Sequence, residues 1–146
     1  MKKKVLFDTN VLIAGMLEQH IHHYKAYPWL EKAYELEIEP YVASQSLLEL
    51  YSILTKDSFN IRLSPVEARK MIHHNVEKIT NIVTLNVDEY FHVLDSMEKL
   101  NIRGYKIYDA IIAYSGLKAN VDTILTFNYN DFKKVIPDNQ DKILIP

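Results

Sequence analysis

Four acidic residues lie beside apolar stretches, and folding of those stretches could bring the four carboxylates together in one site. Asp8 directly follows the apolar residues 4–7, and Glu49 lies among leucines, while Asp109 opens a nearly all-apolar segment and Asp131 comes shortly after another. Carboxylates brought together repel one another and lose hydration, so such a group persists only around a shared cation. Mg²⁺ takes oxygen ligands, keeps several waters and is usually held by one or two carboxylates with substrate phosphates. These acids therefore indicate a divalent-cation site for phosphate chemistry.

Each acid, taken singly, also has a simpler interpretation. Asp8, Asp109 and Asp131 could be ordinary residues of helix N-termini, where capping and the helix dipole favour a carboxylate. Glu49 has the spacing of an exposed polar stripe with Gln45, Ser52 and Lys56. No single acid decides between the two interpretations, so the context of all four has to be considered.

The elements that must position these acids can be recognised from apolar spacing. The predicted strands are residues 4–7, 40–43, 82–85, 122–126 and 143–145. The predicted helices are residues 10–17, 24–36, 46–56, 65–78, 87–100, 108–118 and 131–135. Strands that alternate with helices predict an α/β fold with a mainly parallel central sheet, because parallel neighbours need helical crossovers. Ligands collect at the carboxyl ends of such strands, where Asp8, Asp109 and Asp131 would lie.

The spacing also predicts which helical residues face the core. Ser64 as N-cap, Pro65 at the first position and Glu67 three residues after the cap predict a sharp helix start. The helix at residues 108–118 is apolar nearly all round and should be largely buried. The residues predicted to face inward on the other helices are Ala26, Leu30, Ala33 and Tyr34, then Leu47, Leu50, Tyr51 and Leu54, then Val87, Tyr90, Phe91, Leu94 and Met97.

Composition limits the class of protein. With 146 residues, 48% hydrophobic and 25% charged, the chain has the size and composition of one folded domain over residues 1–146. The absence of cysteine excludes disulfides and thiolate zinc sites. Asp8 interrupts the amino-terminal apolar run before a signal peptide is complete, and the apolar stretch at residues 11–17 is too short to span a bilayer, so a cytoplasmic location is expected. A net charge of −2 gives no sign of a simple nucleic-acid binder.

Four segments, in their order and spacing, resemble the PIN-domain ribonucleases. The first follows an apolar amino-terminal strand, the second lies in a helix after the second strand, the third opens an Ala/Ile-rich helix, and the fourth follows a later strand. The resemblance covers nearly the whole chain, and the size and single-domain build are similar to the VapC toxins of type II toxin–antitoxin pairs. The segments are Asp8-Thr9-Asn10, Glu49-Leu50, Asp109-Ala110 and Thr126-Phe127-Asn128-Tyr129-Asn130-Asp131-Phe132.

The resemblance implies a fold and an activity. It implies a PIN-like three-layer α/β/α sandwich and endonucleolytic cleavage of RNA by water activated by one or two Mg²⁺ or Mn²⁺ ions. In-line attack by water would leave a 5′-phosphate and a 3′-hydroxyl. Partners implied by the family are the RNA substrate, a cognate protein antitoxin and a second copy of the chain in a homodimer. Because four of the 19 acidic residues would then face metal, the charge of −2 no longer argues against an RNA substrate.

The resemblance also implies which residues form the site. Asp8 would be the central ligand, and Phe127 departs from the family pattern, in which a basic residue is common at its position. The residues implied to be catalytic and to surround the metal are Asp8, Glu49, Asp109 and Asp131, and those implied to support them are Thr9, Asn10, Thr126 and Asn128.

Basic residues and histidines give two further expectations. Arg103 and Lys106 come just before Asp109, and Lys133 and Lys134 come just after Asp131, so these four cations are candidates to bind substrate phosphates, although scattered solubilising charges explain each of them equally well. His20, His22 and His23 lack the spacing and the partners of a tetrahedral zinc site and are expected to be surface residues of a loop.

Four alternative functions can be weighed against an RNA-cleaving toxin. A haloacid-dehalogenase-like phosphotransferase or a receiver domain would need a second acid near Asp8, and position 10 is Asn. A PIN-domain nuclease with a housekeeping role in RNA processing or on DNA is the nearest alternative. A PIN domain that only binds a partner is disfavoured because all four acids are present.

Overall fold

The computed structural model describes residues 1–57 and 62–146. Its centre is a five-stranded sheet in which every pair of neighbours is parallel, with the order β3-β2-β1-β4-β5. The predicted parallel α/β sheet is therefore confirmed. The strands are β1 Lys3–Phe7, β2 Ile38–Ala43, β3 Asn81–Val83, β4 Thr123–Leu125 and β5 Ile143–Leu144.

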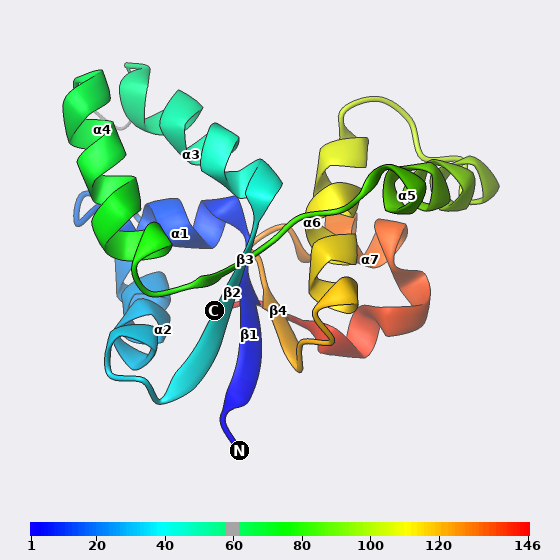
Figure 1. Cartoon of the computed structure of the whole chain (residues 1–146), viewed down its shortest axis with the longest axis horizontal. Coiled ribbons are helices and arrows are strands. Elements are labelled where there is room, and N and C mark those ends of the chain that lie inside the picture. The colour runs from blue at the N-terminus through cyan, green and yellow to red at the C-terminus, as the bar shows by residue number, and fades with distance from the viewer. Residues whose placement is uncertain (58–61) are drawn as a thin grey trace.

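Helices cover both faces of the sheet, which gives the expected three-layer α/β/α sandwich (Figure 1). One face carries α1 Thr9–Met16, α2 His23–Tyr34, α3 Ser44–Thr55 and α4 Pro65–Ile72, which continues into a π-helical turn at His73–Glu77. The other face carries α5 Val87–Lys99, α6 Lys106–Lys118 and α7 Tyr129–Val135, followed by a 3-10 turn at Pro137–Lys142. No helix among the described residues is long and apolar enough to cross a membrane.

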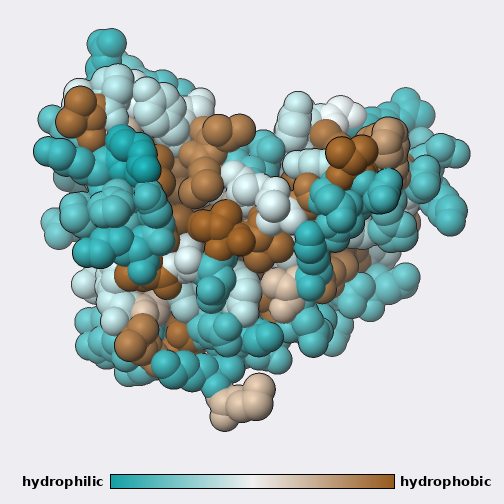
Figure 2. All heavy atoms as spheres, viewed as in Figure 1, coloured by the Kyte–Doolittle hydropathy of each residue, from teal (hydrophilic) through white to brown (hydrophobic). Residues whose placement is uncertain are grey.

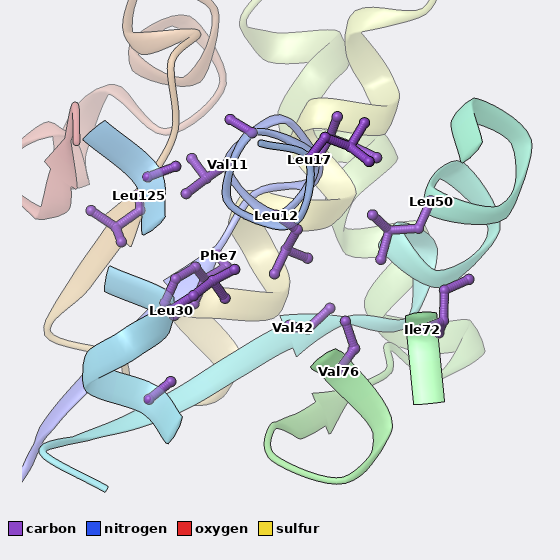
Figure 3. Packing of buried hydrophobic residues seen from close by; sticks show 14 of the residues in the cluster. Phe7, Val11, Leu12, Leu17, Leu30, Val42, Leu50, Ile72, Val76 and Leu125 are labelled. Carbon is purple, nitrogen blue, oxygen red and sulfur yellow. The ribbon is translucent and has the colours of Figure 1, made fainter. Parts of the chain in front are cut away.

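The central strand β1 separates two hydrophobic cores by the alternation of its side chains. Val5 and Phe7 are buried in the core under α1 and α2, and Leu6 is buried in the core under α6 and α7. Figure 3 shows the first core, where Phe7 lies beside Leu30 of α2. Because both faces of the sheet are covered, β1 is entirely apolar in its second half, as parallel strands usually are.

Two local signals position the helices. Ser64 caps α4 with a capping box, in which Ser64 Oγ accepts from the Glu67 N–H at 3.2 Å and a Glu67 carboxylate oxygen accepts from the Ser64 N–H at 3.2 Å, as predicted. In α1, a Cβ on Gly15 would lie 2.5 Å from Leu30 Cδ1, so glycine allows α1 and α2 to approach closely.

The inward face predicted for α5 is wrong except at Met97. Val93 and Met97 are buried, whereas Val87, Phe91 and Leu94 are 68%, 60% and 51% exposed. Among the residues of α5, Val93 and Met97, spaced i and i+4, form a narrow seam that packs in the core beside α6. The apolar residues of α5 extend well beyond that seam. Tyr34, Tyr51 and Tyr90 are also exposed rather than inward-facing, because each lies at the edge of its helix's buried stripe.

Several predicted boundaries also move by one or two residues. The helix predicted from residue 108 begins at Lys106, and the helix predicted from residue 131 begins at Tyr129. Asp109 and Asp131 therefore lie within the first turns of α6 and α7 rather than at their first residues. The helical segment predicted to end at residue 78 changes from α to π geometry at His73.

Candidate active site

Asp8 lies at the carboxyl end of the central strand and caps α1. One carboxylate oxygen accepts from the Thr9 N–H at 2.7 Å, and the other accepts from the Thr126 hydroxyl at 2.7 Å. The Asp8 N–H donates to the Leu125 carbonyl at 2.9 Å, which ties the residue to β4. With a side chain only 4% exposed, the Asp8 carboxylate is fixed between the first and fourth strands.

Glu49 reaches the same region from the third helix. The Thr9 hydroxyl lies 2.7 Å from Glu49 Oε1 and donates to it, and it is also hydrogen-bonded to Ser46 Oγ at 2.9 Å. Glu49 is therefore not simply a member of a solvated stripe, because it is half-buried and held by the residue next to Asp8. Ser46, which is fully buried, belongs to this network although its sequence context gave no signal for it.

Asp109 and Asp131 complete a group of four carboxylates at the carboxyl edge of the sheet. In Figure 1 the first turns of α3 and α6 both lie beyond the upper ends of the strands, at the edge of the sheet where β1 ends. Burial chiefly raises the pKa of Asp8 to about 7, with the charges of Asp109 and Glu49 adding to the rise and the Thr126 hydrogen bond opposing it. Burial likewise raises the pKa of Asp109 to about 6, with contributions from Asp131 and Glu49. Asp8, Glu49 and Asp109 are thus close enough to repel one another, and Asp131 is close enough to repel Asp109.

The donor set fits a hard cation that keeps much of its own water. All donors in the group are oxygens, and both Asp8 oxygens already accept hydrogen bonds. Across residues 1–57 and 62–146, no three side chains of His, Cys, Asp or Glu converge tightly enough to enclose an ion. Such an open arrangement suits Mg²⁺ or Mn²⁺, which protein carboxylates often hold together with waters and substrate oxygens, and does not suit a tetrahedral zinc site.

Comparison with known families shows to which family the chain belongs. A family model described as "PIN domain" matches residues 5–136. The chain belongs to the PIN domain family. Ribonuclease VapC27 of Mycobacterium tuberculosis is 26% identical to this PIN domain over 113 residues, which is 77% of each chain.

Two solved structures share the fold of this PIN domain. The first is VapBC2 from Rickettsia felis, bound to a DNA fragment from the VapBC2 promoter. Its matched chain gives a TM-score of 0.66 at 18% identity, and the match covers 98% of this chain and 97% of that chain. Mycobacterium tuberculosis VapC20, a sarcin-ricin loop cleaving toxin, gives a TM-score of 0.65 at 12% identity, with 87% and 92% covered. The expected PIN-like architecture is therefore confirmed along nearly the whole length of the chain.

The predicted supporting residues lie around the acids of this PIN domain. Asn10 Oδ1 accepts from the Phe127 N–H at 3.3 Å and so connects α1 to the segment after β4. The Asn128 N–H donates to Thr126 Oγ1 at 2.9 Å, so Asn128 acts through its backbone. Thr126 thus links Asp8 to the start of α7, and Thr9 links Asp8 to Glu49.

Three of the four predicted basic residues gather beside the acids. Arg103, Lys106 and Lys134 line one hollow of about 440 Å³. Lys106 Nζ also lies 3.8 Å from Asp131 Oδ1, which places this hollow next to the acidic group. Lys133 is exposed on α7 but does not line the hollow, because successive residues of a helix point in different directions.

His20 and His22 lie in the turn between α1 and α2, as expected for a loop, and His23 begins α2, but all three are half-buried rather than fully on the surface. His20 Nδ1 accepts from the His22 N–H at 3.0 Å, and His23 Nδ1 is hydrogen-bonded to the Ala14 carbonyl at 2.8 Å. The His22 ring is stacked on Phe127, with centroids 4.9 Å apart and planes 25° from parallel. The segment between α1 and α2 therefore packs against the residue that follows Thr126, a long-range contact that local spacing does not indicate.

Proposed function

We propose that this PIN domain is a metal-dependent endoribonuclease that hydrolyses RNA phosphodiester bonds with metal-activated water. The observation that carries the proposal is the group of Asp8, Glu49, Asp109 and Asp131 at one edge of the sheet, where burial and mutual repulsion raise the pKa of two of them. A site that gathers negative charge in this way favours a bound cation. The similarity to Ribonuclease VapC27 supports RNA as the substrate.

The acids, the threonines beside them and Lys106 would have different roles in this reaction. Asp8, Glu49, Asp109 and Asp131 would hold one or two Mg²⁺ or Mn²⁺ ions, which lower the pKa of bound water and neutralise charge on the phosphate. Thr126 and the Thr9 N–H orient the two oxygens of Asp8, and the Thr9 hydroxyl orients Glu49. Lys106 would add a fixed positive charge beside Asp131.

The basic hollow would hold the RNA backbone. Arg103, Lys106 and Lys134 present three cations, of which Lys106 alone has an acidic partner within the described residues. Arg and Lys are the usual ligands of backbone phosphates, which fix the register of a nucleic acid without reading its sequence. Lys133, exposed on the same helix, would contribute only to the general attraction of RNA.

Incubation with total cellular RNA tests the proposed reaction. We expect cleavage in Mg²⁺ and none in EDTA, with activity restored by excess Mg²⁺, because the carboxylates alone cannot activate water. The new ends should carry a 5′-phosphate and a 3′-hydroxyl, which ligation of an adaptor to the products detects. Cleavage that persists in EDTA, or products that end in a 2′,3′-cyclic phosphate, would contradict the proposal.

We further propose that the chain is the toxin of a VapBC-type pair in the cytoplasm, bound by an antitoxin and forming a homodimer. The similarity to VapC27 and the shared fold with VapBC2 and VapC20 support the assignment. The molecule also offers apolar surface for protein contacts, since Figure 2 shows apolar side chains between α3, α4 and β3. A hollow of about 320 Å³ there is lined mainly by Leu47, Leu48, Tyr51, Ile72 and Ile82.

Expression in a bacterial host separates a toxin from a housekeeping nuclease. We expect growth arrest on induction of the wild-type chain, relieved by co-expression of the small protein encoded beside it, because free toxin would degrade an essential RNA. The Asp8→Asn variant, expressed to the same level, should not arrest growth. Normal growth on induction of soluble, RNA-cleaving protein would favour the housekeeping function instead.

A further inference from the structure

Besides the basic hollow, a second hollow lies beside the Lys106–Asp131 pair and is lined by Asp131 rather than by Lys106. It measures about 530 Å³ and is lined by Phe127, Asn128, Tyr129, Asn130, Asp131 and Ile145. Asp131 therefore lines this hollow and also lies 3.8 Å from a lysine that lines the basic hollow. The two hollows are adjacent, and the candidate metal ligand Asp131 stands where they meet.

The chemistry of the second hollow is that of a base-binding site rather than a phosphate site. No lysine or arginine lines it, and the carboxylate of Asp131 would repel a phosphate. Two half-buried aromatic residues, Phe127 and Tyr129, are instead among those that line it, and aromatic side chains are the usual stacking partners of nucleobases. The side-chain amides of Asn128 and Asn130 are exposed and make no hydrogen bond within the described part of the chain, so their donors and acceptors are available to a base edge.

The ring of Phe127 is held in place before any ligand arrives. His22 stacks against it, with ring centroids 4.9 Å apart, and the Phe127 N–H donates to Asn10. Phe127 also packs against the core under α1 and α2. A stacking surface that is already ordered loses little conformational entropy when it binds a base, so this ring is well prepared for that role.

We infer that the hollow formed by Phe127, Asn128, Tyr129 and Asn130 binds one unpaired nucleobase of the RNA, next to the phosphate that is cleaved. This inference rests on the proposed function. It assigns the hollows separate roles, in which the basic one holds a backbone phosphate and the aromatic one holds a base. A base can enter such a hollow only when it is unstacked and unpaired, so the site selects single-stranded segments or loops over duplex RNA.

Fluorescence of 2-aminopurine tests the inference directly. The probe is a short single-stranded RNA that spans the main cut site mapped on total RNA, with 2-aminopurine placed at each position in turn. Binding is measured in Mg²⁺ with the Asp8→Asn variant, so that the RNA stays intact. We expect quenching by stacking at one position beside the cut, and loss of that quenching when Phe127→Leu is added, because leucine keeps the apolar packing but lacks the ring.

Affinity provides the second measurement. Phe127→Leu in the Asp8→Asn background should weaken binding by about 5- to 150-fold, the range that stacking on one aromatic side chain gives. The matched control is Phe91→Leu, which removes a ring exposed on α5 and should leave affinity unchanged. An abasic residue at the quenched position should weaken binding to a similar degree and abolish the difference between the Phe127→Leu protein and its parent.

Each result separates the inference from the function on which it rests. The base site is wrong, and the proposed nuclease activity is unaffected, if the wild type cleaves RNA but 2-aminopurine is quenched at no position. The same conclusion follows if Phe127→Leu weakens the binding of abasic RNA as much as the binding of normal RNA. If Phe127→Leu weakens only an antitoxin complex and not RNA binding, the hollow is a protein contact and the inference fails. If the wild type cleaves no RNA in Mg²⁺, the proposed function and the base site are both overturned.

Discussion

Replacing Asp8 with asparagine is expected to reduce RNA cleavage more than about 100-fold while leaving the protein folded. Loss of an outer partner of a metal ligand already costs about 10- to 100-fold, and Asp8 is proposed as the central ligand itself. Asparagine is isosteric and can keep both contacts, since its oxygen accepts from the Thr9 N–H and its amide can donate to Thr126 Oγ1. The loss would therefore reflect the missing charge rather than a disrupted helix cap.

The measurement is the initial rate of cleavage of a defined RNA in Mg²⁺, with circular dichroism and thermal unfolding to establish that the variant folds. Asp95→Asn is the matched control, because Asp95 is an exposed acid on α5, outside the acidic group. The Asp95→Asn variant should cleave RNA like the wild type. Equal cleavage by Asp8→Asn and the wild type, purified in the same way, would show that the activity comes from a contaminant or from another site.

The free energy of unfolding of the metal-free protein is expected to fall as pH rises from about 4 to about 7. Burial chiefly raises the pKa of Asp8 from 3.8 to about 7 and that of Asp109 from 3.8 to about 6. Between these values the native carboxyls keep protons that the unfolded chain has released, so the native state binds more protons and rising pH favours unfolding. Above about pH 7 the native carboxyls are ionised as well, and this part of the stability is lost.

Asp8→Asn should remove the Asp8 part of this pH dependence and raise the free energy of unfolding near pH 8. The expected gain is on the order of a few kcal/mol, because the variant no longer buries a charge beside Asp109 and Glu49. Chemical denaturation in EDTA at a series of pH values measures it, and added Mg²⁺ should stabilise the wild type far more than the variant. An identical pH slope for the wild type and Asp8→Asn would show that Asp8 ionises normally in the native state.

Much of the fold and the acidic group could be predicted because their signals are local. An apolar run followed by Asp8 marks a strand end, and in a parallel sheet the carboxyl ends of the strands share one edge, so Asp8 and the segment after Thr126 were expected at the same edge. The structure adds that their strands, β1 and β4, are direct neighbours. The hydrogen bond between Asp8 and the Thr126 hydroxyl agrees with that reasoning.

The features that were missed depend on which surfaces meet in three dimensions. Most of the predicted inward face of α5, though not Met97, was wrong because apolar residues such as Phe91 extend beyond the seam formed by Val93 and Met97, and spacing alone does not say which apolar residues contact the core. Ser46 gave no signal in the sequence, yet it is buried and hydrogen-bonded to the Thr9 hydroxyl. The stacking of His22 on Phe127 joins segments more than 100 residues apart, which no local pattern encodes.

The separation of the four acids along the chain has a consequence for synthesis. Asp8 and Glu49 lie within residues 1–49, whereas Asp109, Thr126 and Asp131 lie within residues 109–131, and the Thr126 N–H itself donates to the Leu144 carbonyl of β5. A growing chain on the ribosome therefore holds only two of the four acids until residues 109–131 are made, and Thr126 cannot pair with β5 until Leu144 is made. A nuclease assembled in this way would lack a complete site while those segments are still inside the ribosome.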